Sequence, residues 1–170
     1  MGHKVLIIDT SILCVWLKIP GKETCGPDND RWNFDRVNNK IAEELKNNAT
    51  FVLPLASIIE TGNHIAQCRG DKYEFVHEFV KLIKNTAEEQ SPWAAFTQQN
   101  SLWNKDGSIA LAERWSETAI GGQSIGDAAI VDVARFYSEM PSTHVEILTG
   151  DSGLKAYEPI LDQQIPRRRQ

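Results

Sequence analysis

Four acidic residues stand where a strand-like apolar run gives way to a helical pattern, or where such a helical pattern begins. They are Asp9, Glu60, Asp127 and Asp151. Carboxylates about 5 Å apart repel each other by roughly 3 kcal/mol per pair at an effective dielectric constant near 20. If the fold brings the four together, a cation must offset their charge or some must be protonated. Oxygen ligands favour Mg²⁺ or Mn²⁺, whereas thiolates and imidazoles would favour zinc.

Each of these acids, taken alone, also fits an ordinary structural role. Glu60 follows Ser57, and Asp127 follows Ser124, at the spacing of a capping box, in which the acid bonds back to the N–H of the cap. Asp151 fits the N-cap of the helix that follows it, and Asp9 fits a residue that bonds the turn it starts. The individual motifs therefore leave the structural role open, and the positions of all four together favour a shared site.

The elements that must position these acids alternate between strands and helices. Expected strands span residues 4–9, 50–56 and 144–149, with a further short strand at 92–97. Expected helices begin at residue 12 and span residues 34–47, 57–68, 73–86, 109–118, 125–140 and 152–157. Strands that are apolar along their whole length are typical of parallel sheets covered on both faces. The pattern predicts a three-layer α/β/α sandwich with a mostly parallel central sheet, whose ligands bind beyond the carboxyl ends of the strands.

Two details of this pattern carry further expectations. Pro54 falls inside the second expected strand, which places that strand at an edge or a bulge. The first helix is expected to be capped by Thr10 or Ser11 and to stop at the Pro-Gly pair at 20–21. Residues 18–33 are rich in Gly, Pro, Asp and Asn and are expected to form a surface loop.

Length and composition predict one globular domain. The chain has 170 residues, of which 41% are hydrophobic, and its net charge of −5 excludes a uniformly basic nucleic-acid-coating surface. We expect the domain to span residues 1–158, followed by a C-terminal segment at 159–170 whose three arginines form a solvated basic tail. Three cysteines and the lack of a long apolar stretch predict a cytoplasmic protein with reduced thiols and no membrane segment.

The four acids lie in segments that together resemble the PIN-domain family of metal-dependent ribonucleases, which includes the toxin component of VapBC-type toxin–antitoxin pairs. The matching segments are VLIIDTS at 5–11, LPLASIIE at 53–60, SIGDAAIVDVA at 124–134 and ILTGDSGL at 147–154. The resemblance spans residues 4–157. The chain departs from the family pattern in long loops at 18–33 and 91–122, and in Thr61, where an apolar residue is expected.

The resemblance implies an endoribonuclease that uses Mg²⁺ or Mn²⁺ to hydrolyse single-stranded or structured RNA. Its acidic site would consist of Asp9, Glu60, Asp127 and Asp151. Ser11 and Thr149 would be the supporting hydroxyls that hold the first and the fourth acid. A toxin of this kind implies an antitoxin-like protein inhibitor, and homodimers are common in the family.

Two other function classes fit the same residues. In the first, the domain is a binding or assembly module, and the acids are only helix caps. In the second it is a metal-dependent phosphatase, because Asp9-Thr10 is reminiscent of haloacid dehalogenases, although Ser11 stands where their second aspartate is expected. Metal titration would separate the first class from a nuclease, and turnover of phosphomonoesters would reveal the second.

Two further residues are candidates for contact with substrate. His64 stands one helical turn after Glu60 and is expected to face the same cleft, whereas a zinc site of His64 with Cys68 lacks further ligands. Trp32 lies in the polar loop, where its indole could stack on a base or dock a partner.

Overall fold

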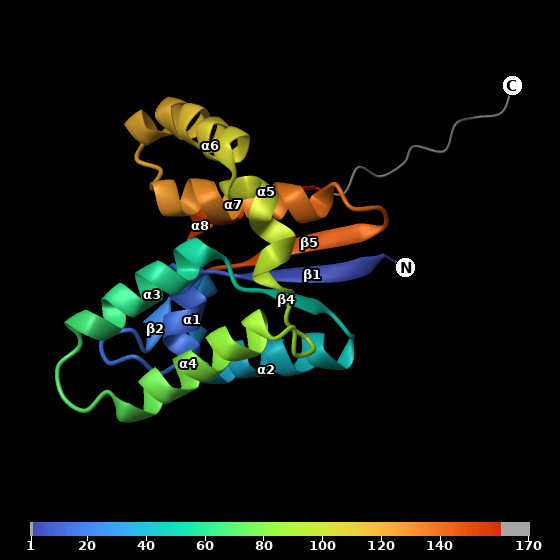
Figure 1. The fold of residues 1–170 in the computed structure, drawn as a ribbon. Helices are drawn as coiled ribbons and strands as arrows, with labels where there is room; N and C mark the ends of the chain where they lie inside the picture. The colour runs from blue at the N-terminus through green and yellow to red at the C-terminus, as the bar shows by residue number, and fades with distance from the viewer. Residues whose placement is uncertain (1, 161–170) are drawn as a thin grey trace, which may run out of the picture.

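A three-stranded parallel sheet forms the centre of the computed structural model, which describes residues 2–160 (Figure 1). Its strand order is β4-β1-β5, with β1 (His3–Ile8) between β4 (Thr50–Val52) and β5 (Thr143–Leu148). Both neighbours run parallel to β1. A single parallel bridge joins Phe51 to Trp93, so the strand expected at 92–97 is reduced to one paired residue.

Helices connect the strands of the sheet, and five of them lie between β4 and β5. The helices are α1 (Thr10–Trp16), α2 (Phe34–Lys46), α3 (Leu55–Gln67), α4 (Tyr73–Ala87), α5 (Asn100–Trp103), α6 (Lys105–Thr118), α7 (Ile125–Ser138) and α8 (Ser152–Lys155). Short 3₁₀ turns occur at Asp28–Asp30, Phe96–Gln99 and Ala119–Gly121. The loop expected at 18–33 also contains a small antiparallel pair, β2 (Thr24–Cys25) and β3 (Trp32–Asn33), which the local sequence does not reveal.

Two hydrophobic clusters cover the two faces of the sheet. Successive strand residues point to opposite faces, so Leu6 and Ile8 of β1 join one cluster, while Val5 and Ile7 join the other. Residues of α1, α2 and α4 pack in the first cluster, and residues of α7 dominate the second. Figure 1 shows these helices on opposite sides of the strands. The structure thus confirms an α/β protein with a small parallel sheet flanked by helices.

The prediction for the second strand is wrong beyond residue 52. Pro54 is the N-cap of α3 and not a strand residue, and its φ of −62° suits the start of a helix. Because α3 begins at Leu55, Ser57 lies inside it. Ser57 Oγ donates a hydrogen bond to the carbonyl of Ile8 at 2.9 Å, so Ser57 and Glu60 form no capping box.

The start of the first helix also differs from the prediction. Asp9 is the N-cap of α1, and its carboxylate accepts a hydrogen bond from the backbone N–H of Ser11, so neither Thr10 nor Ser11 caps the helix. Helix α6 begins at Lys105, four residues before the expected start, because Asn104 caps it. Among the described residues, no helix is long and apolar enough to cross a membrane. The arginines of the basic tail lie outside the described residues.

A cluster of two lysines and two glutamates ties β1, α2 and β5 together. Lys4 Nζ lies 2.5 Å from Glu44 Oε1 and 2.6 Å from Glu146 Oε2. Lys40 Nζ contacts the same two oxygens at 2.7 and 3.0 Å. The Glu44 side chain is 3% exposed, and although burial opposes its ionisation, the two ammonium groups hold its pKa below the ordinary value.

Candidate acidic site

The four predicted acids line one cavity of about 290 Å³ beyond the carboxyl ends of the strands. They come from four different places in the fold: Asp9 follows β1, Glu60 lies in α3, Asp127 lies in the first turn of α7, and Asp151 caps α8. The parallel arrangement of β4, β1 and β5 brings the segments that follow these strands to one edge of the sheet. The structure therefore places together residues that are up to 142 positions apart.

Asp9 is held by the two hydroxyls that the sequence singles out. Its backbone N–H donates to the carbonyl of Leu148 at 3.1 Å, which sets it beside the end of β5. Asp9 Oδ2 accepts hydrogen bonds from Ser11 Oγ at 2.6 Å and from Thr149 Oγ1 at 2.8 Å. Thr149 Oγ1 in turn accepts from the N–H of Asp151 at 2.9 Å. One threonine thus fixes the first and the fourth acid relative to each other.

Glu60 reaches across from α3 to the start of α7. Its Oε2 accepts a hydrogen bond from Thr10 Oγ1 at 3.0 Å. Its Oε1 lies over Gly126, where a β-carbon would stand only 2.1 Å from this oxygen. The absence of a side chain at position 126 therefore makes room for the Glu60 carboxylate.

The charges of the four acids act on one another. Burial raises the pKa of Glu60, and the nearby Asp127 and Asp9 raise it further, against the hydrogen bond from Thr10. Burial also raises the pKa of Asp127, with Asp9 and Asp151 adding to the effect and hydrogen bonds to Ser124 opposing it. Both shifts show that the negative charges on these two side chains are disfavoured in the protein alone.

Two of the capping roles expected from the sequence are present, and Asp9 bonds the turn it starts, capping α1 in place of Thr10 or Ser11. Besides Asp9 on α1, Asp151 Oδ1 accepts from the N–H groups of Gly153 and Leu154 at 2.7 and 3.2 Å. Ser124 caps α7 by accepting from the N–H of Asp127 at 2.9 Å. These bonds do not use all the carboxylate oxygens, because within residues 2–160 no hydrogen bond reaches Asp9 Oδ1, Asp151 Oδ2 or Glu60 Oε1.

The donor set fits a hard divalent cation in kind, since carboxylate oxygens with neighbouring hydroxyls are the ligands that Mg²⁺ and Mn²⁺ prefer. The spacing of these side chains in the structure does not fit such a cation. Across residues 2–160, no three His, Cys, Asp or Glu side chains stand close enough together to hold a metal ion. An ion would have to draw the carboxylates closer together than they stand.

The cavity also contains residues that sequence reasoning missed. Lys22, Cys14 and Cys25 line it together with the acids. Cys25 belongs to β2. Its sulfur lies so close to Gly150 that a β-carbon at position 150 would stand only 2.5 Å from it. A glycine directly after Thr149 is the one signal of this close approach that the sequence offers. His64 lines the same cavity, as expected, whereas Cys68 Sγ donates to the carbonyl of Pro20 at 3.7 Å.

Trp32 lines a second cavity of about 320 Å³ that shares Asp151 with the first. The guanidinium carbon of Arg36 lies 3.7 Å from the centroid of its ring, so a cation already covers one face of the indole. The indole also packs against the core on the α1 and α2 side of the sheet. Trp32 therefore stands beside the acids, with at most one face free for stacking.

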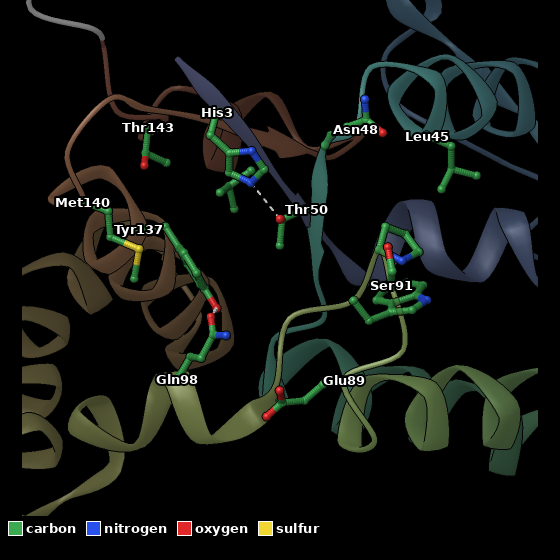
Figure 2. A pocket seen from close by; sticks show the side chains of 14 residues that line it. His3, Leu45, Asn48, Thr50, Glu89, Ser91, Gln98, Tyr137, Met140 and Thr143 are labelled. Carbon is green, nitrogen blue, oxygen red and sulfur yellow. Dashed lines mark hydrogen bonds between the residues drawn. The ribbon is translucent and has the colours of Figure 1, made fainter. Parts of the chain in front are cut away.

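A cavity of about 490 Å³, larger than the one that the acids line, lies at the opposite ends of the strands (Figure 2). The first residues of the strands line it, and His3 and Thr50 are joined there by a hydrogen bond of 2.7 Å between Nε2 and Oγ1. Tyr137 donates its hydroxyl to Gln98 Oε1 at 3.3 Å on the other side. Among its described lining residues, Glu89 is the one carboxylate, and there is no lysine or arginine. The larger of these two cavities is therefore not the one in which the acidic side chains gather.

In comparisons with known proteins, no family model matches the chain, and no curated protein and no solved structure matches it either.

Proposed function

We propose that this protein is a metal-dependent endoribonuclease of the PIN-domain type, which hydrolyses phosphodiester bonds in RNA with Mg²⁺ or Mn²⁺. The observation that supports it is the gathering of four carboxylates from four separate elements in one cavity. Helix capping explains single acids, but it gives no reason for all four to converge at the edge of the sheet where parallel α/β proteins bind ligands. The raised pKa values of Glu60 and Asp127 support the proposal, because carboxylates that would bind a cation repel one another when the cation is absent.

The roles of the residues follow from their hydrogen bonds. Asp9, Asp127 and Asp151 would hold the ion, with Thr149 and Ser11 fixing Asp9. A bound divalent ion would polarise the scissile phosphate and lower the pKa of the attacking water. Glu60 would orient that water and accept its proton at Oε1, because Thr10 occupies Oε2. A carboxylate with a raised pKa is better suited to take a proton than one with an ordinary pKa.

A binding or assembly module is the second candidate, and two observations favour it. Asp9 and Asp151 already serve as helix caps, and in the described part of the chain no three His, Cys, Asp or Glu side chains are arranged to hold an ion together. Under this proposal Asp9 and Asp151 stabilise the starts of α1 and α8, and the protein binds neither Mn²⁺ nor Mg²⁺ at this cavity.

Cleavage of single-stranded RNA with and without Mn²⁺ tests the proposal. We expect the parent protein to cleave, and Asp9→Asn and Asp127→Asn to lose at least a hundredfold in rate. Asp35→Asn, an exposed acid in the first turn of α2, is the matched control for the loss of one charge. Equal cleavage by the parent and the site variants would overturn the proposal, and so would an inactive parent that binds no Mn²⁺ in a calorimetric titration. Turnover of p-nitrophenyl phosphate in place of RNA would instead identify a phosphatase.

We also propose a toxin role held in check by an antitoxin-like protein inhibitor. Expression of the parent protein should then arrest bacterial growth, and Asp9→Asn should not. Gel filtration tests the homodimer that the same proposal implies. Growth that is unaffected by the parent protein would remove the toxin role without touching the nuclease proposal.

A further inference from the structure

One lysine stands among the four acids, on the loop between α1 and β2. The buried Ile19 anchors this loop, and its N–H donates to the carbonyl of Cys14 at 3.1 Å. The N–H of Lys22 donates back to the carbonyl of Ile19 at 2.9 Å. On the other side, Cys68 at the end of α3 donates its thiol to Pro20. The loop is tied to both α1 and α3, so Lys22 is held at the rim of the cavity.

The Lys22 ammonium has no carboxylate partner within the described chain, although four carboxylates line the same cavity. No oxygen of an Asp or Glu among residues 2–160 lies within 4.0 Å of its nitrogen. The other described residues that line the cavity are acidic or uncharged. Of these, only His64 could carry a positive charge, and only when its imidazole is protonated. A lysine that neutralised the acids would pair with one of them, so its charge remains available to a ligand.

His64 is the second group at this rim. It lies on α3 four residues after Glu60, which is about 6 Å along the helix axis, and both side chains line the cavity. Burial lowers the pKa of His64, and the charge of Lys22 lowers it further, so the two groups are near enough to interact. A neutral imidazole donates one hydrogen bond and adds no charge. Lys22 and His64 thus offer a cation and a directional donor in the same cavity.

We propose that Lys22 and His64 bind a second phosphate of a polynucleotide, the neighbour of the phosphate on which the acids act. The identity of the cleaved phosphate rests on the proposed function. The net charge of −5 gives RNA little long-range attraction, so its phosphates depend on local cations of this kind. The His64 end of the cavity lies a full helical turn from Glu60, which separates the bound phosphate from the one at the acids. A phosphomonoester would leave this subsite empty.

Two RNA substrates separate the neighbouring phosphate from the scissile one. One is an oligonucleotide of about ten residues, and the other is a dinucleotide with a single phosphodiester. On the oligonucleotide, we expect Lys22→Gln and His64→Gln to raise KM about tenfold, the loss typical of one charge-assisted hydrogen bond, with kcat almost unchanged. On the dinucleotide, neither variant should change KM. Lys46→Gln, at the end of α2 away from the acids, is the control for charge and should behave as the parent protein.

Binding to the non-cleaving Asp9→Asn variant gives a readout that does not need catalysis. For a single strand, loss of one phosphate contact should reduce the slope of log affinity against log salt by about 0.7. We therefore expect this reduction for Asp9→Asn with Lys22→Gln, and none for Asp9→Asn with Lys46→Gln.

The outcomes distinguish this inference from the proposed function. Equal KM increases on both substrates would place Lys22 at the scissile phosphate and overturn the inference, while leaving the nuclease intact. An unchanged KM on the oligonucleotide would overturn it as well. If the parent protein does not cleave RNA, the proposed function fails, and the subsite is then tested only by the salt dependence of RNA binding. An unaltered slope in the Lys22→Gln variant, or no RNA binding at all, rejects the subsite.

Discussion

The carboxylate of Glu60 occupies the space that a side chain at Gly126 would need, since a β-carbon there would stand 2.1 Å from Glu60 Oε1. This relationship links the second and third acidic segments, because Gly126 directly precedes Asp127 at the start of α7. The glycine therefore belongs to the geometry of the site and not only to the start of the helix.

Gly126→Ala should damage the site without unfolding the protein. The methyl group displaces a flexible carboxylate, while alanine favours a helix over glycine by up to about 1 kcal/mol. We expect Tm to stay level or rise by a few degrees, and Mn²⁺-dependent RNA cleavage to fall at least tenfold. Gly62→Ala, in α3 with open space around it, is the matched control and should keep full activity. Full activity in Gly126→Ala would mean that the position of Glu60 is unimportant.

Thr149→Val should uncouple the first acid from the fourth. Valine keeps the shape of the side chain, which is 7% exposed, but loses the bond to Asp9 Oδ2 and the bond from the N–H of Asp151. We expect a loss of about 1–3 kcal/mol in the free energy of unfolding by urea, since buried polar groups lose their partner. Thr149→Ser keeps the hydroxyl and should restore both stability and cleavage. A serine variant as damaged as the valine variant would show that the methyl group, and not the hydrogen bonds, matters.

Asp127→Asn should stabilise the protein when no metal is present. Burial and the neighbouring acids raise the pKa of Asp127, so the folded state binds protons more tightly than the unfolded state. Its ionised form therefore costs stability as pH rises above about 4, the ordinary value for aspartate. In EDTA at pH 7, we expect a Tm above that of the parent protein, by about 2–4 °C for each kcal/mol relieved. Added Mn²⁺ should raise the Tm of the parent protein more than that of the variant. A Tm below that of the parent in EDTA would show that the bonds to Ser124 outweigh the repulsion.

Glu44→Gln tests the buried cluster that joins β1, α2 and β5. The ammonium groups of Lys4 and Lys40 lower the pKa of Glu44 against the effect of burial, so the stability it adds is present above its unfolded pKa, about 4.3. This stability is lost as pH falls through the still lower folded pKa. We expect the variant to lose about 1.5–3 kcal/mol at pH 7 and the difference to shrink in acid. Glu43→Gln, one residue earlier and exposed, should change stability by less than about 0.5 kcal/mol. A deficit independent of pH would indicate lost packing.

Trp32→Ala tests the second cavity as a place for a base. Stacking on an aromatic ring contributes about 1–3 kcal/mol per base, so we expect RNA affinity to fall by about 5- to 150-fold. Trp32→Phe should keep most of the affinity, and urea unfolding of both variants separates this effect from the packing of the indole against the core. Unchanged affinity in Trp32→Ala would remove Trp32 from the binding surface.

The sequence by itself determined the alternation of strands and helices and the places of the acids. A strand that is buried on both faces consists of apolar residues along its whole length, as around Ile7. Such a run can be recognised in the sequence without knowledge of the tertiary contacts. The roles of Ser11 and Thr149 were implied by the family resemblance, and the contact of Thr149 with Asp9 joins residues 140 positions apart through the pairing of β1 with β5.

Only the tertiary structure decided how the acids are spaced and what else shares their cavity. Pro54 fits both an edge strand and a helix start, and the packing of α3 beneath Ile8 selects the second. Lys22 lies in a stretch of glycine, proline and charges with no periodicity, and the burial of Ile19 fixes its place at the acids. Contacts between segments distant in sequence depend on how whole elements pack. Local pattern therefore predicted the elements, and long-range packing assembled the site.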